Sequence, residues 1–340
     1  YYENIVVDKS VTITGENNET TIVNGANENG AVFALVKSEV TIENLNIREG
    51  SWYGIGINCY SDFDLDSNKN TIRDNIFVNN KEGIYIGNSN DNKITNNLVQ
   101  ETESSKYATV GIHLSESDFN LIDSNKFLYL NQGIDLVNAC SNIVKDSIIT
   151  RNDCGIGVSS GSKNEIKSNR IIETSRGISL WRDSGSVSEN IIKENVIKES
   201  NRQAIYLMLS ENSLVIENEI TDNDVGIEIY YSENNEIYHN NFDNELNVKM
   251  GNSASNTWDD GTQGNYWSDY DGTDINNNGI GDTSYTIDDN NKDRHPWMNP
   301  DGEGVNNKVV STPVIDFIED MLNNFDWPFP MLRVMLWALG

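Results

Sequence analysis

Short alternations of apolar and polar residues recur along residues 1–250, at intervals of about 22 residues. Each repeat reads x-I-x-x-N-x-I, then a few polar residues, then G-I-x-I and a polar turn that ends in Asn. An alternation with a period of two residues is typical of a β-strand. Runs this short bury too little apolar surface to form a core alone, so the repeats are predicted to stack on one another.

Two positions of the repeat recur with nearly the same spacing along the chain. One is a polar residue in the first half of each repeat, and the other is a small residue before the second strand. The polar position is held by Asn75, Asn97, Asn125, Ser147, Asn169, Asn195, Asn218 and Asn240, and the small one by Gly83, Gly111, Gly133, Gly155, Gly177, Ala204 and Gly226.

This pattern predicts an all-β fold, a right-handed parallel β-helix of about ten coils of roughly 22 residues each. Coils stacked about 4.8 Å apart pair each strand in parallel with its counterparts, and inward isoleucines then form columns. Gly and Asn are expected at the corners because they accept a positive φ. Stacked Asn side chains can also hydrogen bond from coil to coil.

The pattern changes twice after the repeats. The β-helix is assigned to residues 1–250, and residues 251–302, rich in Asp, Asn, Gly and aromatic residues, are predicted to form a small C-terminal module that closes it. Residues 303–340 are a linker and an apolar tail, in which helical spacing over 313–324 predicts a short helix. The tail is predicted either to cover the solenoid or to dock into a neighbouring subunit, which would cause self-association. No apolar run reaches the roughly 18 residues of a transmembrane helix, so no membrane-spanning segment is predicted.

The chain is strongly acidic. It has 340 residues with a formal net charge of −29, from 53 acidic and 24 basic side chains. Nucleic acids and anionic membrane surfaces would be repelled, so neither is a predicted partner. Cations and neutral glycans remain as partners, and the charge suits an extracellular or cell-surface location.

A candidate calcium loop begins at Asp274, where the chain reads D-I-N-N-N-G-I-G-D, the spacing of loops of the EF-hand type. Oxygen ligands at this spacing favour Ca²⁺ as a structural ion. Tyr285 stands where an EF-hand has a glutamate, so a carboxylate from elsewhere must complete the site. Alternatively, the segment is an Asx-rich turn that binds no metal. The predicted ligands are the side chains of Asp274, Asn276, Asn278, Asp282 and Asp288 and the carbonyl group of Ile280.

Outward residues of stacked strands should form columns, and two such columns carry unusual residues. The position two after each corner glycine gives Tyr85, His113, Asp135, Gly157, Ser179, Tyr206 and Glu228. Two positions further along, large residues in consecutive coils predict a strip that stacks on sugar rings or buries against a partner. The alternative is packing under an inserted loop at 182–187. The predicted strip consists of Trp181, Arg182, Tyr206, Met208, Tyr230 and Tyr231.

The repeats resemble the PbH1-type repeats of the NosD-like and CASH-domain family of secreted carbohydrate-associated and cell-surface β-helix proteins. Residues 240–298 are similar to the segment that closes such helices, especially in archaeal surface proteins. The resemblance covers about residues 1–300 and implies the fold, while the family mixes enzymes, accessory factors and surface proteins. NosD also suggests copper, but His113, His239 and His295 are far apart in the sequence, so a copper site is not predicted.

These observations predict a secreted or cell-surface structural protein, calcium-stabilised and able to assemble into an envelope layer, sheath or filament. The alternative is an extracellular carbohydrate-binding or polysaccharide-cleaving protein, either a lyase or a hydrolase. No catalytic residue is assigned, because the aspartate and histidine patterns of polygalacturonases and the D-P-H motif of uronate epimerases are absent from the coils.

Overall fold

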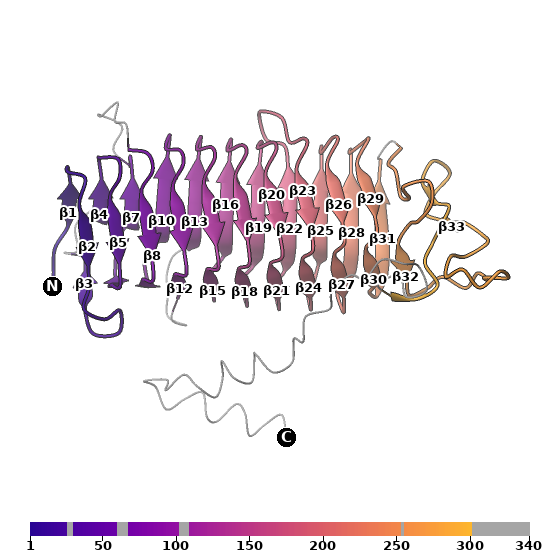
Figure 1. Ribbon diagram of the computed structural model, residues 1–340, viewed down its shortest axis with the longest axis horizontal. Helices are drawn as coiled ribbons and strands as arrows, with labels where there is room; N and C mark the ends of the chain where they lie inside the picture. Colours follow the sequence, from indigo (N-terminus) through magenta and orange to yellow (C-terminus); the bar gives the residue numbers. More distant parts are fainter. Residues whose placement is uncertain (26–29, 60–66, 102–108, 253–254, 301–340) are drawn as a thin grey trace, which may run out of the picture. The chain divides into compact units, whose positions relative to one another are not determined.

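The computed structural model describes residues 1–25, 30–59, 67–101, 109–252 and 255–300 (Figure 1). The chain divides into two compact units, residues 1–307 and 308–340. The predicted tail, residues 303–340 with its short helix, lies outside the described residues. Within the described residues there is no α-helix, so no helix that could cross a membrane is found among them.

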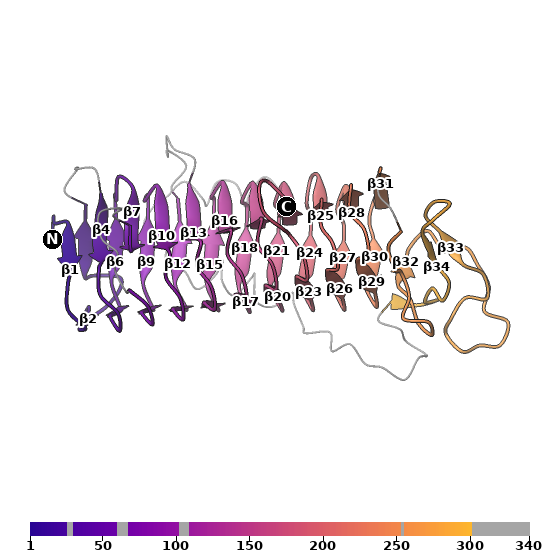
Figure 2. The ribbon, with the colours of Figure 1, turned by 90° about the horizontal axis from the view of Figure 1, so that it is seen from above.

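Three long parallel sheets make up the first unit, which confirms the predicted right-handed parallel β-helix. In Figure 2 the third sheet lies in the middle, with the first sheet above it and the second below. The first sheet contains β1 (Ile5–Val7), β4 (Ala31–Leu35), β7 (Tyr53–Ile57), β10 (Glu82–Gly87), β13 (Val110–Ser115), β16 (Gln132–Val137), β19 (Cys154–Ser159), β22 (Arg176–Trp181), β25 (Gln203–Met208), β28 (Val225–Tyr230) and β31 (Leu246–Gly251). The second contains β2 (Thr12–Thr14), β5 (Thr41–Glu43), β8 (Thr71–Arg73), β11 (Lys93–Thr95), β14 (Leu121–Asp123), β17 (Ile143–Lys145), β20 (Glu165–Lys167), β23 (Ile191–Lys193), β26 (Leu214–Ile216) and β29 (Glu236–Tyr238). The third contains β3 (Ile22–Asn24), β6 (Asn46–Arg48), β9 (Ile76–Val78), β12 (Leu98–Gln100), β15 (Lys126–Leu128), β18 (Ile148–Thr150), β21 (Arg170–Ile172), β24 (Val196–Lys198), β27 (Glu219–Thr221), β30 (Asn241–Asp243) and β32 (Tyr266–Trp267).

The core is a set of stacked inward columns. Ile84, Ile112 and Ile134 are successive partners in the first sheet and are fully buried. Phe77 and Phe127 fill the same interior from the third sheet. Burial of this kind stabilises by roughly 25 cal/mol per Å² of apolar surface. Because every coil contributes equivalent side chains, the core extends without a break from coil to coil.

Buried Asn side chains form two ladders along the corners. In one of them Asn97 Nδ2 donates to Asn125 Oδ1 (3.0 Å), and Asn169 Nδ2 donates to Asn195 Oδ1 (3.0 Å). The other runs along the turns before the second sheet, where Asn142 Nδ2 donates to Asn164 Oδ1 (3.1 Å). The same side chains also bond to the backbone: Asn125 Oδ1 accepts the N–H of Asn97 (3.0 Å), and Asn125 Nδ2 donates to the carbonyl of Ile94 (2.8 Å). These bonds satisfy backbone groups that each turn removes from the sheets.

The corner glycines have a different role from the predicted one. Positive φ falls instead on the residue before the ladder Asn, as at Asp74 (φ 58°) and Asn96 (φ 54°). The corner glycines lie where the chain of the next coil approaches closely, so a Cβ on Gly83 would come within 2.6 Å of the carbonyl oxygen of Gly111. Steric room, and not a left-handed backbone, therefore favours glycine there, and the one exception is the smallest other side chain, Ala204.

Residues 255–300 close the last coil. Strand β32 continues the third sheet, and β33 (Tyr285–Thr286) pairs with β34 (Lys292–Asp293) in antiparallel fashion. The buried ring of Trp267 stacks between Phe242 (centroids 4.7 Å apart) and Tyr285 (4.5 Å). Asn265 extends the first Asn ladder, since its Oδ1 accepts the N–H of Asn240 at 3.0 Å. The module thus covers apolar surface that the final coil would otherwise expose.

Candidate functional site

The outer face of the first sheet holds most of the chemistry-bearing side chains of the solenoid. Its strands present three outward columns, at the positions one before, two after and four after the corner glycine. By strand register, the first column contains Glu82, Val110, Gln132, Cys154, Arg176, Gln203 and Val225. The second contains Tyr85, His113, Asp135, Gly157, Ser179, Tyr206, Glu228 and Lys249. The third includes Ser159, Trp181, Met208, Tyr230 and Gly251.

Four of these side chains form what we call the acid–base group: Glu82, Tyr85, His113 and Asp135. They come from three neighbouring strands, β10, β13 and β16. The Nδ1 atom of His113 lies 3.1 Å from Glu82 Oε2, and both side chains are largely buried, with 22% and 17% exposed. The Tyr85 ring meets the imidazole edge-on, with centroids 5.3 Å apart, and Tyr53 stacks on Tyr85 at 4.7 Å.

The charges of the acid–base group are coupled. Burial disfavours the charged imidazole, but the hydrogen bond and charge of Glu82 outweigh it, and the pKa of His113 is raised above its ordinary value. Burial also raises the pKa of Asp135, against the opposing pull of His113. Burial and the nearby Glu82 charge raise the pKa of Tyr85, which stays a phenol at neutral pH. The arrangement therefore offers a histidine oriented by a carboxylate beside a phenol and a buried carboxyl group.

Further along the same face, polar side chains bridge four strands. Arg176 Nε donates to Gln203 Oε1 (3.1 Å), and Gln203 Nε2 donates to Glu228 Oε2 (2.6 Å). Lys249 Nζ lies 3.0 Å from Glu228 Oε1, and the Arg176 guanidinium lies 5.3 Å from the centre of the Tyr206 ring. Among the described residues Arg176 has no carboxylate partner, so its charge is available to a ligand.

The predicted strip is found on consecutive strands, but its rings point in different directions. Trp181, Met208 and Tyr230 are partners in register and half-buried. The Trp181 ring lies over Gly157, where an added Cβ would come within 2.8 Å of its Cη2, whereas the Tyr230 ring lies over Gly251. Tyr231 is 48% exposed and meets Tyr230 edge-on. The strip is therefore two aromatic sites separated by Met208, with no continuous ring platform.

Arg182 and the inserted loop lie beside the strip. Arg182 forms an ion pair with Glu211 at 3.5 Å. The backbone N–H groups of Asp183, Ser184 and Gly185 all donate to Ser160 Oγ, at 3.0 to 3.2 Å. The loop is thus anchored on the coil of β19.

The candidate calcium loop has the hydrogen bonds of a turned Asx segment. Asp274 accepts the N–H groups of Asn278 (3.2 Å) and Gly279 (2.8 Å), and Asp282 accepts that of Ile275 (2.6 Å). Asn276 Oδ1 accepts the N–H of Asn278, and Asn278 Oδ1 accepts that of Ile280.

The predicted completing ligand, Asp288, is used elsewhere. Its carboxylate accepts the backbone N–H groups of Asn290 and Asn291 and the side-chain amide of Asn291. No three His, Cys, Asp or Glu side chains are placed to hold a metal ion within the described residues. A calcium ion at 274–282 would therefore have two carboxylate ligands, Asp274 and Asp282, and neutral oxygens for the rest.

Two histidines that are distant in sequence meet near Gly264 in the C-terminal module. The N–H of His239 donates to the carbonyl of Gly264, and the N–H of Gly264 donates to the carbonyl of His295, both at 2.8 Å. Each imidazole turns to its own carboxylate, His239 to Asp260 (3.2 Å) and His295 to Asp259 (3.4 Å). They form two separate pairs.

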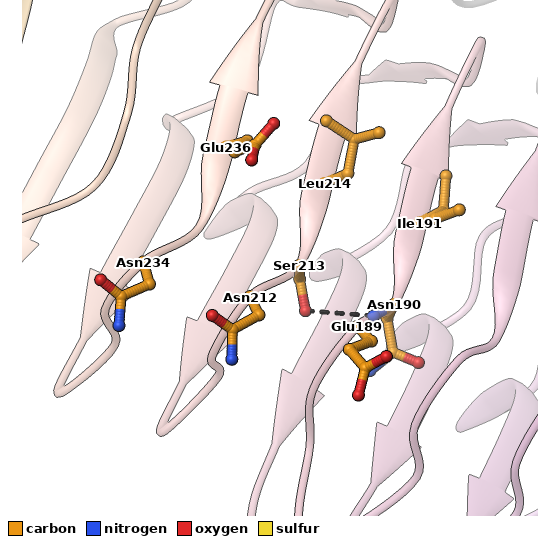
Figure 3. Close-up of a pocket in the computed structure, with 8 residues that line it drawn as sticks. All are labelled: Glu189, Asn190, Ile191, Asn212, Ser213, Leu214, Asn234 and Glu236. Atoms are coloured by element: carbon orange, nitrogen blue, oxygen red, sulfur yellow. Dashed lines mark hydrogen bonds between the residues drawn. The ribbon is translucent and has the colours of Figure 1, made fainter.

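A shallow hollow of about 320 Å³ lies at the corner before the second sheet (Figure 3). Its floor includes Asn190 and Ser213, joined by the Asn190 N–H bond to Ser213 Oγ at 3.3 Å. Asn190 also donates from Nδ2 to the Gly161 carbonyl. Asn190 and Ser213 are thus already used by the second ladder, and the rest of the lining adds two carboxylates, Glu189 and Glu236, but no histidine, cysteine, lysine or arginine. The outer face of the first sheet remains the stronger candidate.

The spacing from the corner glycines predicts the second and third outward columns, and in the structure their members are partners in register on neighbouring strands. The first column, with Glu82, Gln132 and Arg176, was missed. The available signal was the residue directly before each corner glycine, which the coil bend turns outward beside the second column.

Comparison with known protein families identifies one match over most of the chain. A family model described as "Periplasmic copper-binding protein (NosD)" matches residues 2–129 and 105–272. A protein of Stutzerimonas stutzeri described as "Probable ABC transporter binding protein NosD" is 35% identical over 109 residues, which are 32% of this chain and 25% of that protein. The match thus takes in about a quarter of that relative's length.

Solved structures of the same fold are more distant in sequence. The mannuronan C-5 epimerase AlgE6 A-module of Azotobacter vinelandii has a TM-score of 0.52 at 12% identity, over 72% of this chain and 82% of that one. A tailspike protein double mutant of E. coli bacteriophage HK620, in complex with a pentasaccharide, has a TM-score of 0.51 at 12% identity, over 79% and 54%. At these identities the likeness shows the parallel β-helix fold alone.

Proposed function

We propose that this chain, which belongs to the family of the periplasmic copper-binding protein NosD, binds a polysaccharide along the outer face of its first sheet. The observation that carries the proposal is the register of aromatic and hydrogen-bonding side chains on that face. Tyr85, Trp181 and Tyr206 are half-buried rings, and Gln132 and Arg176 lie in the adjacent column. Sugar rings stack on aromatic faces while their hydroxyls bond to amides, guanidinium groups and carboxylates.

The other two sheets offer a useful contrast. Their outward residues include ion pairs such as Lys145 with Asp123 (3.0 Å), Lys193 with Glu165 (3.4 Å) and Lys198 with Glu219. These pairs are partly exposed, and ion pairs that solvent reaches are typical of a solvated surface. The pentasaccharide complex of the tailspike protein supports the idea that a parallel β-helix can present a glycan site.

Glycan-array binding and affinity electrophoresis would test this function. Trp181→Ala and Tyr206→Ala are expected to weaken binding by roughly 5- to 100-fold, since each removes a stacking surface of about 1–3 kcal/mol. Phe119→Ala is the matched control, because Phe119 is 62% exposed and lies outside the three columns. Equal affinity in all three variants, or no glycan bound at all, would refute the proposal.

The family's description also names copper, and the described residues do not fit that metal. Copper favours several His, Met or Cys ligands together. His113 is engaged by Glu82, whereas His239 and His295 turn to separate aspartates.

The proposed setting is the cell envelope or the outside of the cell. The family's periplasmic description and the net charge of −29 support it. In that setting Ca²⁺ bound by Asp274, Asn276, Asn278, Ile280 and Asp282 would be a structural ion that fixes the C-terminal module.

A structural role through self-assembly is the second candidate. Its support is the apolar end of the sequence, MLRVMLWALG, which needs a surface to cover it. Light scattering on the whole chain and on a variant lacking residues 311–340 would test it. An unchanged molar mass after the deletion would exclude assembly through this segment.

A further inference from the structure

The acid–base group has the arrangement of a proton-transfer site. The Glu82 carboxylate lies within hydrogen-bond distance of Nδ1 of His113 and holds the imidazole in place. The other ring nitrogen, Nε2, is therefore the one that can accept a proton from a substrate. Within the described residues Nε2 forms no hydrogen bond. Tyr85 is the next member of the same outward column, one strand away, with its ring against the imidazole.

We propose that this group transfers the C5 proton of a uronate residue in the bound polysaccharide, with His113 as the base and Tyr85 as the acid. This inference rests on the proposed glycan binding. It also requires that Arg176, a cation on this face without a carboxylate partner among the described residues, offsets locally the repulsion that the net charge of −29 exerts on a polyanion. It names the substrate class, a uronate-containing polymer, and the reaction, proton abstraction next to a carboxyl group followed by elimination. Among the atoms of a glycan, the C5–H beside a carboxylate is the carbon-bound hydrogen that a histidine can remove, because the carboxyl group stabilises the charge that develops.

The step balances without any other reactant. The C5–H bond breaks and its proton goes to His113 Nε2, while its electron pair forms the C4–C5 double bond. The C4–O bond then breaks, and the leaving glycosidic oxygen takes the phenolic proton of Tyr85. Solvent afterwards removes the proton from His113 and returns one to Tyr85. No redox change occurs, and one chain is cleaved into a shortened chain and an unsaturated uronate end.

Hydrolysis fits the same residues less well. Glycoside hydrolysis needs two carboxyl groups that both face the scissile bond. Here Glu82 Oε2 is turned to His113, and Asp135 lies on the far side of that imidazole, on β16. A base between two carboxyl groups is better placed to take a proton than to leave room for an attacking water molecule.

Two further groups can contact the polymer. Asp135 Oδ1 is buried and has no hydrogen-bond partner within the described residues, so it can accept a sugar hydroxyl. Arg176 lies three strands beyond His113, or roughly 14 Å at about 4.8 Å per strand. A 1,4-linked pyranose spans a length comparable to one strand spacing, so Arg176 would meet the carboxylate of another residue of the same polymer.

The experiment incubates the whole chain in D₂O with polymannuronate, polyguluronate, polygalacturonate and polyglucuronate, each in turn. Proton NMR follows loss of the C5 proton and growth of the vinyl proton, and ultraviolet absorbance follows the unsaturated end. Binding of each polymer is measured separately by affinity electrophoresis. We expect C5 exchange or unsaturation with at least one polymer.

His113→Gln and Tyr85→Phe are expected to lower the rate by about 100-fold or more while binding changes only slightly. Tyr129→Phe is the control, since it removes a phenol that contacts Arg151 away from this face. Glu82→Gln should lower the rate less than His113→Gln does, because Glu82 positions the imidazole, and it should move the acidic limb of the pH profile to lower pH, since the hydrogen bond and charge of Glu82 raise the pKa of His113. Asp135 and Tyr85 are the other titrating groups that face the imidazole. Melting curves verify that each variant is folded.

Three outcomes would overturn the inference. A polyuronate that binds with no exchange and no unsaturation defeats the chemistry and leaves glycan binding intact. Binding to neutral glycans alone defeats the substrate class. Full activity in His113→Gln defeats the assignment of the base. Absence of binding to any glycan would instead remove the proposed function itself.

Discussion

Replacement of Asn169 by alanine tests the ladder that holds the coils together. The Asn169 side chain is buried, with 1% of its surface exposed. Its Oδ1 accepts the N–H of Ser147, and its Nδ2 donates to the carbonyl of Val144 and to Asn195 Oδ1, each at 3.0 Å. Alanine removes all three bonds.

The expected cost comes from the groups left behind. The N–H of Ser147 becomes a buried donor without a partner, which costs about 1–3 kcal/mol, and the lost bond to Val144 costs about 0.5–1.5 kcal/mol. Asn195 Oδ1 keeps the backbone N–H of Asn169 as a donor, at 3.0 Å, so it adds little. The free energy of unfolding should therefore fall by about 3 kcal/mol.

Urea unfolding and hydrogen exchange at the Ser147 amide would measure this effect. Exchange gives the local value even if the coils do not unfold in one step. Asn201→Ala is the control, because Asn201 is exposed and its side chain forms no hydrogen bond within the described residues. Its change should stay within about 0.5 kcal/mol. An equal loss in both variants, or unchanged protection of the Ser147 amide, would refute the role of the ladder.

Further predictions concern the ladder position of Ser147, the C-terminal module and the calcium loop. Ser147→Asn should raise the urea midpoint, because it restores the amide donor that the other coils carry. Burial raises the pKa of Asp293 to about 6 from an ordinary 3.8, so its contribution to stability is present below 3.8 and is lost as the pH rises through 6. Asp293→Asn should reduce the fall in melting temperature between pH 3.8 and pH 6, and the same fall as in the unchanged chain would contradict the prediction. Calcium should raise the melting temperature of the chain and EGTA should lower it. Asp274→Ala should abolish both shifts and also the heat of calcium binding measured by calorimetry. Identical melting curves with and without calcium would exclude the site.

Some of these features follow from the sequence by itself. In a parallel β-helix the spatial neighbour of a residue is the residue one period further along the chain, so a repeat frame is also a contact map. The positions of Asn125 and Ile134 therefore predict their buried columns, and the glycine spacing predicts that Tyr85 and His113 lie side by side. Register could be predicted because a slip by one residue would turn every isoleucine outward.

Other features were decided only by the tertiary structure. The direction of an outward ring depends on the room beside it, so Trp181 turns over Gly157 and away from Tyr230. The pairing of Glu82 with His113 joins the first and second outward columns across a bend of the chain. The repeat period of the sequence gives no information on the geometry of that bend. In the C-terminal module no repeat exists, and there the fold alone brings His239 and His295 to Gly264. Periodicity fixes which backbones stack, whereas side-chain direction and aperiodic loops depend on packing contacts that appear only once the chain is folded.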